Sequence, residues 1–340
     1  MAGRAIGLVQ LFGRLGRRRL CGKGSERNAD GGGLQSDLVH ISPLMSNAII
    51  VQSASLINPP YCFMKFLRRI AFALAFTSLP AHAGMEAPVA PFQLYGSSYY
   101  VGLEGVGSVL ITSPEGHILI DGGFPESAAY IAANIRTLGF KVEDVKLILN
   151  SHTHGDHAGG IAELQRLSGA IVVSSPVSVA ALRSGMAGKD DPQFADLSPF
   201  PQIGAAQAVA DGEVVRVGPL AVTAFYSPGH TSSGVSWAWA SCQQGRCASM
   251  VFADSLNPYA SAGYRFSDHN DVVQDFGYSY TVFNRLPCDV LIAAHPGSAE
   301  LREQAARGTL IGDGGACKRY AAASRENLKA RLSKERAAAR

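Results

Sequence analysis

The amino-acid sequence predicts an α/β fold in which two β-sheets are sandwiched between helical layers. Groups of short strand-like segments are followed by helical segments, and this order occurs twice along the chain. The composition, 47% hydrophobic and 17% charged residues, supplies enough apolar side chains for a large buried core. At 340 residues, the chain is long enough for one large or two ordinary domains.

The individual elements are predicted from local patterns. Residues 92–123 hold β-branched and aromatic runs separated by Gly, Pro and Ser, which predicts several strands. Residues 126–138 place apolar side chains near helical spacing before a glycine, which predicts a helix. The apolar run at 145–150 predicts a buried strand followed by a helix over 159–169. The same patterns predict strands at 170–175, 213–218, 220–228, 235–242, 249–255 and 289–295, helices from about residue 176, over 271–285 and from about residue 316, and a long loop over 185–211.

Residues 64–83 have the pattern of a signal peptide. They read "MKFLRRIAFALAFTSLPAHA", in which basic residues precede an apolar run and an Ala-x-Ala pattern ends at Ala83. The apolar run is too short for a membrane helix, which needs about 20 residues. The alternative interpretation is a short buried helix. We expect an exported protein that is cleaved after Ala83.

Residues 1–63 are expected to lie outside the functional protein. A secretory signal works at the start of a chain, so we expect Met64 to be the initiator and 1–63 to be a non-native or disordered extension. The alternative is a basic arm, although its arginines lack interleaved aromatic residues. Ten of the 30 basic and three of the 27 acidic residues lie in 1–83, which leaves 20 and 24, a net charge of −4. No nucleic-acid partner is therefore expected.

Four cysteines remain after residue 83, and an even number in an exported chain favours two disulfides. Cys242 and Cys247 bracket a hairpin-like turn, "QQGR", so a Cys242–Cys247 pair is geometrically easy, and Cys288 then pairs with Cys317 by elimination. The rival interpretation, four thiolates on a structural zinc, lacks a Cys-x-x-Cys spacing.

The stretch "NSHTHGDHAGG" at 150–160 predicts a metal site. His152 and His154 are two residues apart and can point to one side of the segment that leaves a strand, whereas Asp156 and His157 follow a glycine that lets the chain turn. Two pairs of ligands in two directions suit two metal ions. Imidazole and carboxylate without thiolate favour zinc, and ligand softness alone also permits iron or manganese.

Further candidate ligands lie at other strand ends. His230 follows a strand and a Pro-Gly turn, and His295 ends an apolar strand before another Pro-Gly. Five of the seven histidines after residue 83 thus lie at strand ends or in turns. His117 and His269 lack this context and are expected to be structural residues or surface residues. Asp121, before two glycines, is either a partner that orients a metal ligand or a turn-forming residue.

These residues resemble the metallo-β-lactamase superfamily and, within it, the subclass B3 β-lactamases of the periplasm. That subclass carries His-x-His-x-Asp-His, Pro-Gly-His-Thr, Ala-Asp-Ser-Leu and Ala-His-Pro segments, which are matched here by "HTHGDH", "PGHT", "ADSL" and "AHP". A disulfide that begins seven residues before the last histidine matches Cys288 and His295. The resemblance covers nearly all of 84–340 and implies an αββα sandwich, two mixed β-sheets flanked by helices, in a periplasmic protein.

The resemblance also implies ligands and an activity. His152, His154 and His230 would bind the first zinc, and Asp156, His157 and His295 the second. Asp156 would in addition orient the zinc-bound hydroxide that hydrolyses the β-lactam amide of penicillins, cephalosporins and carbapenems and so confers antibiotic resistance. The implied substrate contacts are Ser255, Asn257 and Gln193. Asn257 stands where these enzymes often have a serine, which leaves substrate preference open. We expect a monomer with a small-molecule substrate and no membrane association after cleavage.

Two rival functions stay open at this point. The same scaffold supports lactonases, including those acting on acyl-homoserine lactones, and thioesterases; in related enzymes an aspartate near "FADS" bridges two metals, and Asp254 is one residue from that register. A zinc-storage or zinc-binding protein would also explain the ligands. It would leave their open, glycine-rich setting at strand ends unexplained.

Overall fold

The computed structural model describes residues 84–338. The predicted signal peptide at 64–83 and the predicted extension at 1–63 lie outside the described residues. Among the helices of the described part, none combines the length and the apolar character that a membrane span requires.

The first sheet has seven strands in the order β1-β2-β3-β4-β5-β6-β7. Neighbours from β1 to β4 are antiparallel and neighbours from β4 to β7 are parallel, so the sheet is mixed. Its strands are Phe92–Tyr95, Ser98–Tyr100, Val109–Ile111, His117–Ile120, Val145–Leu149, Ile171–Ser174 and Ala206–Ala208.

The second sheet has five strands in the order β12-β11-β10-β9-β8 and is also mixed. β11 and β12 are parallel, whereas the other neighbours are antiparallel. Its strands, β8 to β12, are Val214–Val217, Leu220–Tyr226, Val235–Gln243, Arg246–Ala253 and Val290–Ala293.

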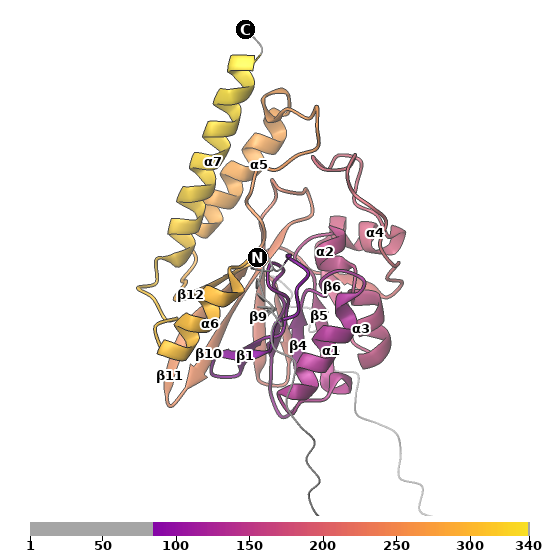
Figure 1. Ribbon diagram of the computed structural model, residues 1–340, viewed down its shortest axis with the longest axis vertical. Helices are drawn as coiled ribbons and strands as arrows, with labels where there is room; N and C mark the ends of the chain where they lie inside the picture. Colours follow the sequence, from indigo (N-terminus) through magenta and orange to yellow (C-terminus); the bar gives the residue numbers. More distant parts are fainter. Residues whose placement is uncertain (1–83, 339–340) are drawn as a thin grey trace, which may run out of the picture. The chain divides into compact units, whose positions relative to one another are not determined.

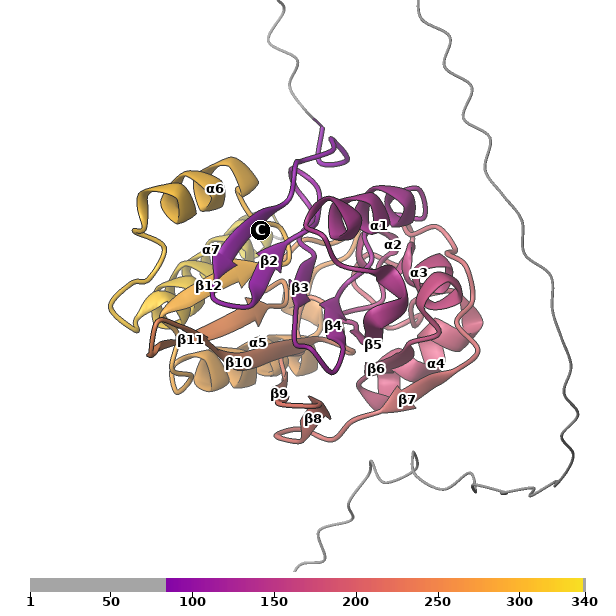
Figure 2. The same cartoon turned by 90° about the horizontal axis from the view of Figure 1, so that it is seen from below.

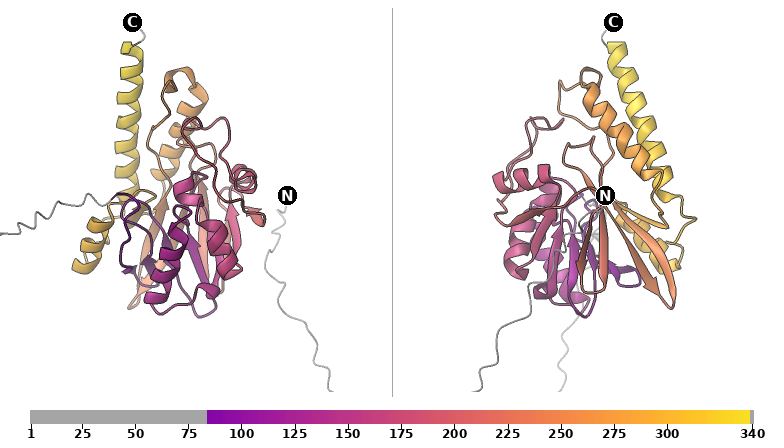
Figure 3. Two further views of the ribbon diagram at one scale, coloured as in Figure 1. Left: turned by 45° about the vertical axis from the view of Figure 1, so that its right-hand side comes forward. Right: turned by 180° about the vertical axis from the view of Figure 1, so that it is seen from behind.

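Helices cover the outer faces of both sheets. α1, α3 and α4 lie against the first sheet and α5 and α7 against the second, as Figures 1 and 2 show from two directions. α5 and α7 run side by side and reach beyond the ends of the strands (Figure 3). The helices α1 to α7 are Ser127–Thr137, Gly155–Ala158, Ile161–Ser168, Pro176–Ser184, Asn270–Phe283, Ser298–Arg307 and Ala316–Ala338, and the 3-10 turns η1 and η2 are Val142–Asp144 and Phe266–Asp268.

The central strands β3 and β4 of the first sheet are buried on both faces, which explains their continuous apolar sequences. In β4, Ile118 and Ile120 enter the core between the sheets, whereas Leu119 points outward to the layer that holds α1 and α3. From the second sheet, Trp237 and Phe252 fill the same inter-sheet core with no solvent exposure. Four layers follow from this burial, so the predicted αββα sandwich with two mixed sheets is confirmed.

The element prediction departs from the structure at α2, β7 and α6. The short helix α2 lies between the predicted strand at 145–150 and the predicted helix over 159–169. Residues 206–208 form β7, inside the segment 185–211 that the sequence predicts as a loop, and pair in parallel with β6. The triplet Ala-Gln-Ala has none of the β-branched or aromatic residues that mark a strand, so pairing with a neighbour decides its conformation. α6 has no counterpart among the predicted elements.

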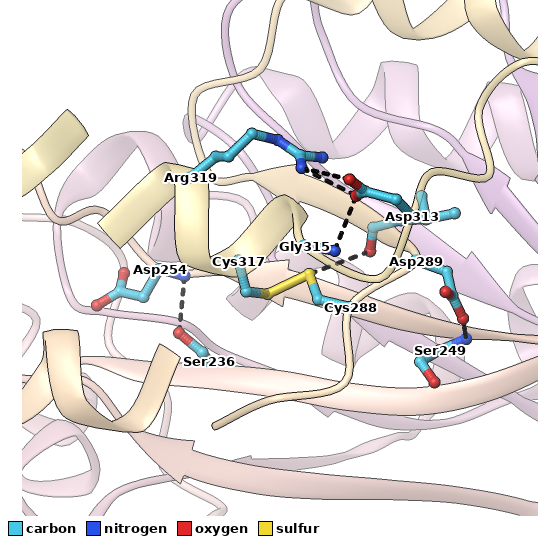
Figure 4. Close-up of a disulfide and its surroundings, with 10 residues drawn as sticks. Ser236, Ser249, Asp254, Cys288, Asp289, Asp313, Gly315, Cys317 and Arg319 are labelled. Carbon is cyan, nitrogen blue, oxygen red and sulfur yellow. Dashed lines mark hydrogen bonds and ion pairs between the residues drawn. A yellow bond between two sulfur atoms is a disulfide. The ribbon is translucent and has the colours of Figure 1, made fainter. Parts of the chain in front are cut away.

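Both predicted cysteine pairs lie at bonding distance. The sulfur atoms of Cys242 and Cys247 are 1.96 Å apart across the β10–β11 hairpin, and those of Cys288 and Cys317 are 2.18 Å apart. The second pair joins the segment before β12 to the first turn of α7 (Figure 4). α7 is thereby fixed to the second sheet.

Candidate metal centre

The cluster loop, residues 150–154, leaves the carboxyl end of β5 and enters the short helix α2. Asp121, at the end of the neighbouring parallel strand β4, holds this loop: its Oδ1 accepts the Ser151 backbone N–H at 2.7 Å and its Oδ2 accepts the Ser151 hydroxyl at 2.6 Å. Asn150 donates from Nδ2 to the His152 carbonyl at 2.7 Å. These bonds fix the backbone from which the histidines project.

The first group of candidate ligands is His152, His154 and His230. One ring nitrogen of each lies within 4.8 Å of the others. The three side chains are buried, although His230 comes from the loop after β9 in the second sheet and the other two come from the first sheet. The set predicted for the first metal is therefore brought together.

The second group, Asp156, His157 and His295, is spaced more tightly. Asp156 Oδ2 lies 3.3 Å from His157 Nε2 and 3.5 Å from His295 Nε2, and the two nitrogens are 3.2 Å apart. Zinc–ligand bonds of about 2.0–2.1 Å in a tetrahedron place neighbouring ligand atoms about 3.3 Å apart. A donor of His152 also lies within 4.8 Å of Asp156 and His157, so the two groups adjoin.

Each of the five histidines in these two groups has one ring nitrogen beside a hydrogen-bond acceptor. The pairs are His152 Nδ1 with Asp254 at 2.8 Å, His154 Nε2 with Asp191 at 3.0 Å, His157 Nδ1 with Asp121 at 3.1 Å, His230 Nδ1 with the Asn257 carbonyl at 2.9 Å, and His295 Nδ1 with the Gly105 carbonyl at 2.9 Å. An acceptor retains the ring proton on the nitrogen that it faces, which leaves a lone pair on the other nitrogen. Within residues 84–338, nothing bonds to that other nitrogen of His152, Nε2. The donor set thus fits metal ions.

Burial keeps most of these imidazoles neutral. Burial lowers the pKa of His152 well below its usual range and, with His154 nearby, lowers that of His230 to about 3. Burial and the neighbouring His157 also lower the pKa of His295.

His157 is the exception. Burial would lower its pKa, but the charge of Asp156 and the hydrogen bonds that His157 donates to both Asp121 and Asp156 raise it to about 10. The pKa of Asp156 is held below its ordinary value, because the attraction of His157 outweighs the effect of burial. Without metal, Asp156 and protonated His157 form an ion pair, and a metal ion bound there would replace that proton.

Asp254 lies beneath the cluster and is fully buried. Its Oδ1 approaches His152 Nδ1 at 2.8 Å, but neither carboxylate oxygen has an aligned hydrogen bond within the described chain. Burial raises the pKa of this carboxyl well above its usual range, so both members of the pair favour their neutral forms. Asp254 touches the nitrogen of His152 that is opposite the unbonded Nε2.

Two of the predicted substrate contacts, Gln193 and Asn257, lie beside His230 of the first group. Gln193 Nε2 is 3.2 Å from His230 Nε2. Asn257 is exposed and donates its backbone N–H to the hydroxyl of the buried Ser255 at 3.3 Å. Ser261 N–H donates to the Pro192 carbonyl at 3.0 Å, which ties the two loops that carry these residues to each other.

The remaining sequence candidates lie where they were expected. His117, in β4, packs edge-on against Phe140 with ring centroids 5.1 Å apart, and His269 stacks on Tyr264 at 4.3 Å. Asp121 fits both of its alternatives, because it binds His157 and also adopts a positive φ of 56° at the turn.

Sequence reasoning missed Asp191 and the Gly105 carbonyl. Asp191 bonds His154 and, through Oδ1, the backbone N–H of Gln193 at 2.8 Å. Its only sequence signal is an acidic pair inside a long loop, and a backbone carbonyl leaves no signal at all.

Known proteins resemble this chain along most of the described part. A family model for the "Metallo-beta-lactamase superfamily" matches residues 101–256. The structure of metallo-beta-lactamase SMB-1 bound to 2-mercaptoethanesulfonate is 47% identical, with a TM-score of 0.72 over 74% of this chain and 99% of that one. MEM-A1, a subclass B3 metallo-beta-lactamase from a soil metagenome library, is 50% identical, with a TM-score of 0.71 over the same shares.

A second kind of relative matches over a shorter stretch. A hydroxyacylglutathione hydrolase of Rhodopseudomonas palustris (strain BisB5) is 34% identical over 113 residues, 33% of this chain, and the match spans only 35% of that protein. The near-complete coverage of the solved structures, at up to half identity, decides the family. This chain belongs to the metallo-beta-lactamase superfamily.

Proposed function

We propose that this protein is a zinc-dependent β-lactamase that hydrolyses the β-lactam amide of penicillins, cephalosporins and carbapenems. The observation that carries the proposal is its likeness to SMB-1 and MEM-A1, which are 47% and 50% identical and are covered over 99% of their chains. Subclass B3 membership, export to the periplasm, a monomeric state and a role in antibiotic resistance are parts of the same proposal.

The proposed ligands are two sets of three. His152, His154 and His230 hold the first zinc, and Asp156, His157 and His295 hold the second. The separations of 3.2–3.5 Å in the second set, and the acceptor beside one ring nitrogen of each histidine, support this division. The contact of Asp254 with Nδ1 leaves Nε2 of His152 as the ligating atom. A donor of His152 lies within 4.8 Å of both groups, and its assignment to the first set follows the resemblance to subclass B3 enzymes. A donor set of imidazole and carboxylate without thiolate favours zinc.

When bound, the zinc ions polarise the scissile carbonyl and lower the pKa of a water molecule toward about 7. Asp156 is the accessible carboxylate of the cluster, with 20% of its side chain exposed, whereas Asp121 and Asp254 are fully buried. It accepts a hydrogen bond from the attacking water and directs the water's lone pair toward the carbonyl carbon. The new C–O bond replaces the C–N bond of the ring, and the ring nitrogen ends with a proton derived from water.

The loops above the first group orient the substrate. The amide N–H groups of Gln193 and Asn257 and the hydroxyl of Ser255 are donors for the substrate's carboxylate and carbonyl oxygens. Since water attacks directly, no serine nucleophile is required and no acyl-enzyme should accumulate.

The second candidate is hydrolysis of a thioester or a lactone, which the partial match to hydroxyacylglutathione hydrolases favours. That reading gains if Asp254 bridges two metals. The contact of Asp254 with His152 Nδ1, the nitrogen opposite the unbonded Nε2, instead supports a role in orienting the ligand.

The test is turnover by purified residues 84–340. The proposal expects hydrolysis of a carbapenem and a penicillin, loss of that activity to a chelator and its recovery with zinc. Turnover of S-lactoylglutathione or an acyl-homoserine lactone without turnover of β-lactams would replace it with the second candidate. Bound zinc with none of these activities would indicate a zinc-binding protein.

A further inference from the structure

The carboxyl-terminal helix α7 is linked to the neighbourhood of the metal centre by hydrogen bonds of one tyrosine hydroxyl. Tyr320, in α7, donates its hydroxyl proton to the Asp254 carbonyl at 3.1 Å and accepts the Leu256 backbone N–H at 3.1 Å. The single oxygen thus bonds to the peptide groups on both sides of Ser255. Burial raises the pKa of Tyr320, so the phenol remains protonated and keeps its donor.

The three-residue segment 254–256 connects α7 to a proposed ligand. Its first side chain, Asp254, faces His152 Nδ1 at 2.8 Å, and its last, Leu256, is fully buried in the core beneath α5 and α7. A third bond holds the segment from the sheet side, because the Asp254 backbone N–H donates to Ser236 Oγ at 3.0 Å. A shift of this segment would therefore change the position of the Asp254 carboxyl group relative to the His152 ring.

Tyr320 itself sits on a fixed helix. It lies one turn after Cys317, whose sulfur is at bonding distance from Cys288 beside the second sheet (Figure 4). Its ring packs against Phe283 of α5 with centroids 5.6 Å apart. The disulfide fixes the helix and the packing against Phe283 fixes the ring, so the position of the phenol is set by contacts that involve none of the proposed ligands.

We propose that Tyr320 is a positioning residue for the metal centre. By clamping the backbone of 254–256, it sets the carboxyl of Asp254 against His152 and places Ser255 beside the substrate loops. This inference rests on the proposed ligand role of His152. It assigns to α7, which supplies no ligand, control over the geometry of the first metal.

Tyr320→Phe tests the inference, because it removes the hydroxyl and keeps the ring. The matched control is Tyr280→Phe: Tyr280 lies in the same core, 3% exposed, and its hydroxyl has no hydrogen-bond partner within residues 84–338. The protein is loaded with Co²⁺, and the visible absorption bands and the Co²⁺ affinity are measured beside thermal unfolding. We expect Tyr320→Phe to change the bands and to weaken Co²⁺ binding, by less than the about 10- to 100-fold that loss of a direct ligand partner costs. Tyr280→Phe should match the wild type.

A folded Tyr320→Phe with wild-type bands and affinity, even at a lower Tm, overturns the inference, and so does an equal change in Tyr280→Phe. Should Tyr320→Phe fail to fold, Ser236→Ala decides by the same criteria, because it removes the other hydrogen bond to Asp254. The readout needs no substrate, so an inactive wild-type enzyme would refute the proposed β-lactamase function and leave this comparison intact.

Discussion

Replacing Asp121 by asparagine should impair the second metal site more than the first. Asp121 Oδ1 accepts the Ser151 backbone N–H at 2.7 Å, and its Oδ2 faces His157 Nδ1 at 3.1 Å. Asparagine has the same shape and tolerates the positive φ of 56° at this position. The Ser151 N–H requires an acceptor oxygen at the place of Asp121 Oδ1, so the amide NH₂ of the variant takes the place of Oδ2 and faces His157.

That NH₂ group is a donor where the wild type has an acceptor. His157 then accepts at Nδ1 and carries its own proton on Nε2, the atom that faces Asp156 and His295. Metal binding must reverse this tautomer and leave a buried N–H unmatched, which costs about 1–3 kcal/mol. We expect the second equivalent of zinc to bind about 10- to 100-fold more weakly.

Competition with a chromophoric chelator measures both binding steps. The first step, assigned to His152, His154 and His230, should change less, because the oxygen that accepts the Ser151 backbone N–H is kept, and it serves as an internal comparison. Asp313→Asn is the matched control, because Asp313 has a side chain 73% exposed and pairs with Arg319 far from any proposed ligand. Uptake of the second equivalent by Asp121→Asn with the wild-type Kd would refute the tautomer argument.

Three further results are expected. The raised pKa of His157 stabilises the metal-free protein fully below the unfolded-state pKa of about 6.5, and this stabilisation is lost progressively as pH rises toward about 10. The gain in Tm on adding zinc should therefore grow from about pH 6.5 to about pH 10. A gain that does not depend on pH would contradict this role of His157. Replacing both Cys288 and Cys317 by alanine should lower the free energy of unfolding by about 1.5 kcal/mol more than replacing Cys242 and Cys247, because the paired residues are 29 and 5 positions apart; equal denaturant midpoint shifts would argue otherwise. Glu335→Ala should cost about 1–3 kcal/mol, because Glu335 accepts the Ser267 N–H at 2.9 Å and pairs with Arg331; kcat/KM should stay at the wild-type value, and a loss there would reveal an unexpected link to the site.

Sequence pattern predicts the fold, and it singles out the candidate ligands, for a physical reason. The buried strands must be apolar, and polar histidines directly after such strands are conspicuous, as at His152, His230 and His295. The parallel pairing of β4 with β5 places Asp121 beside the cluster loop, and that of β11 with β12 places His295 beside the end of β11. The packing of the two sheets then brings His152 of the first sheet together with the histidines of the second. Pattern alone cannot supply the partners of the ligands. Asp191 comes from a loop without periodicity, and the Gly105 carbonyl could belong to any residue type, so only the folded chain identifies them.

The distribution of the proposed ligands over two sheets has a consequence for how metal affects folding. Four of the six lie within residues 152–157, so an unfolded chain already carries a local chelating peptide, whereas His230 and His295 join it only when the second sheet docks. Zinc that also binds the unfolded chain stabilises the native state by less than its native affinity alone would give. The net contribution of metal to stability therefore comes from the extra affinity that the two distant histidines add when the second sheet docks.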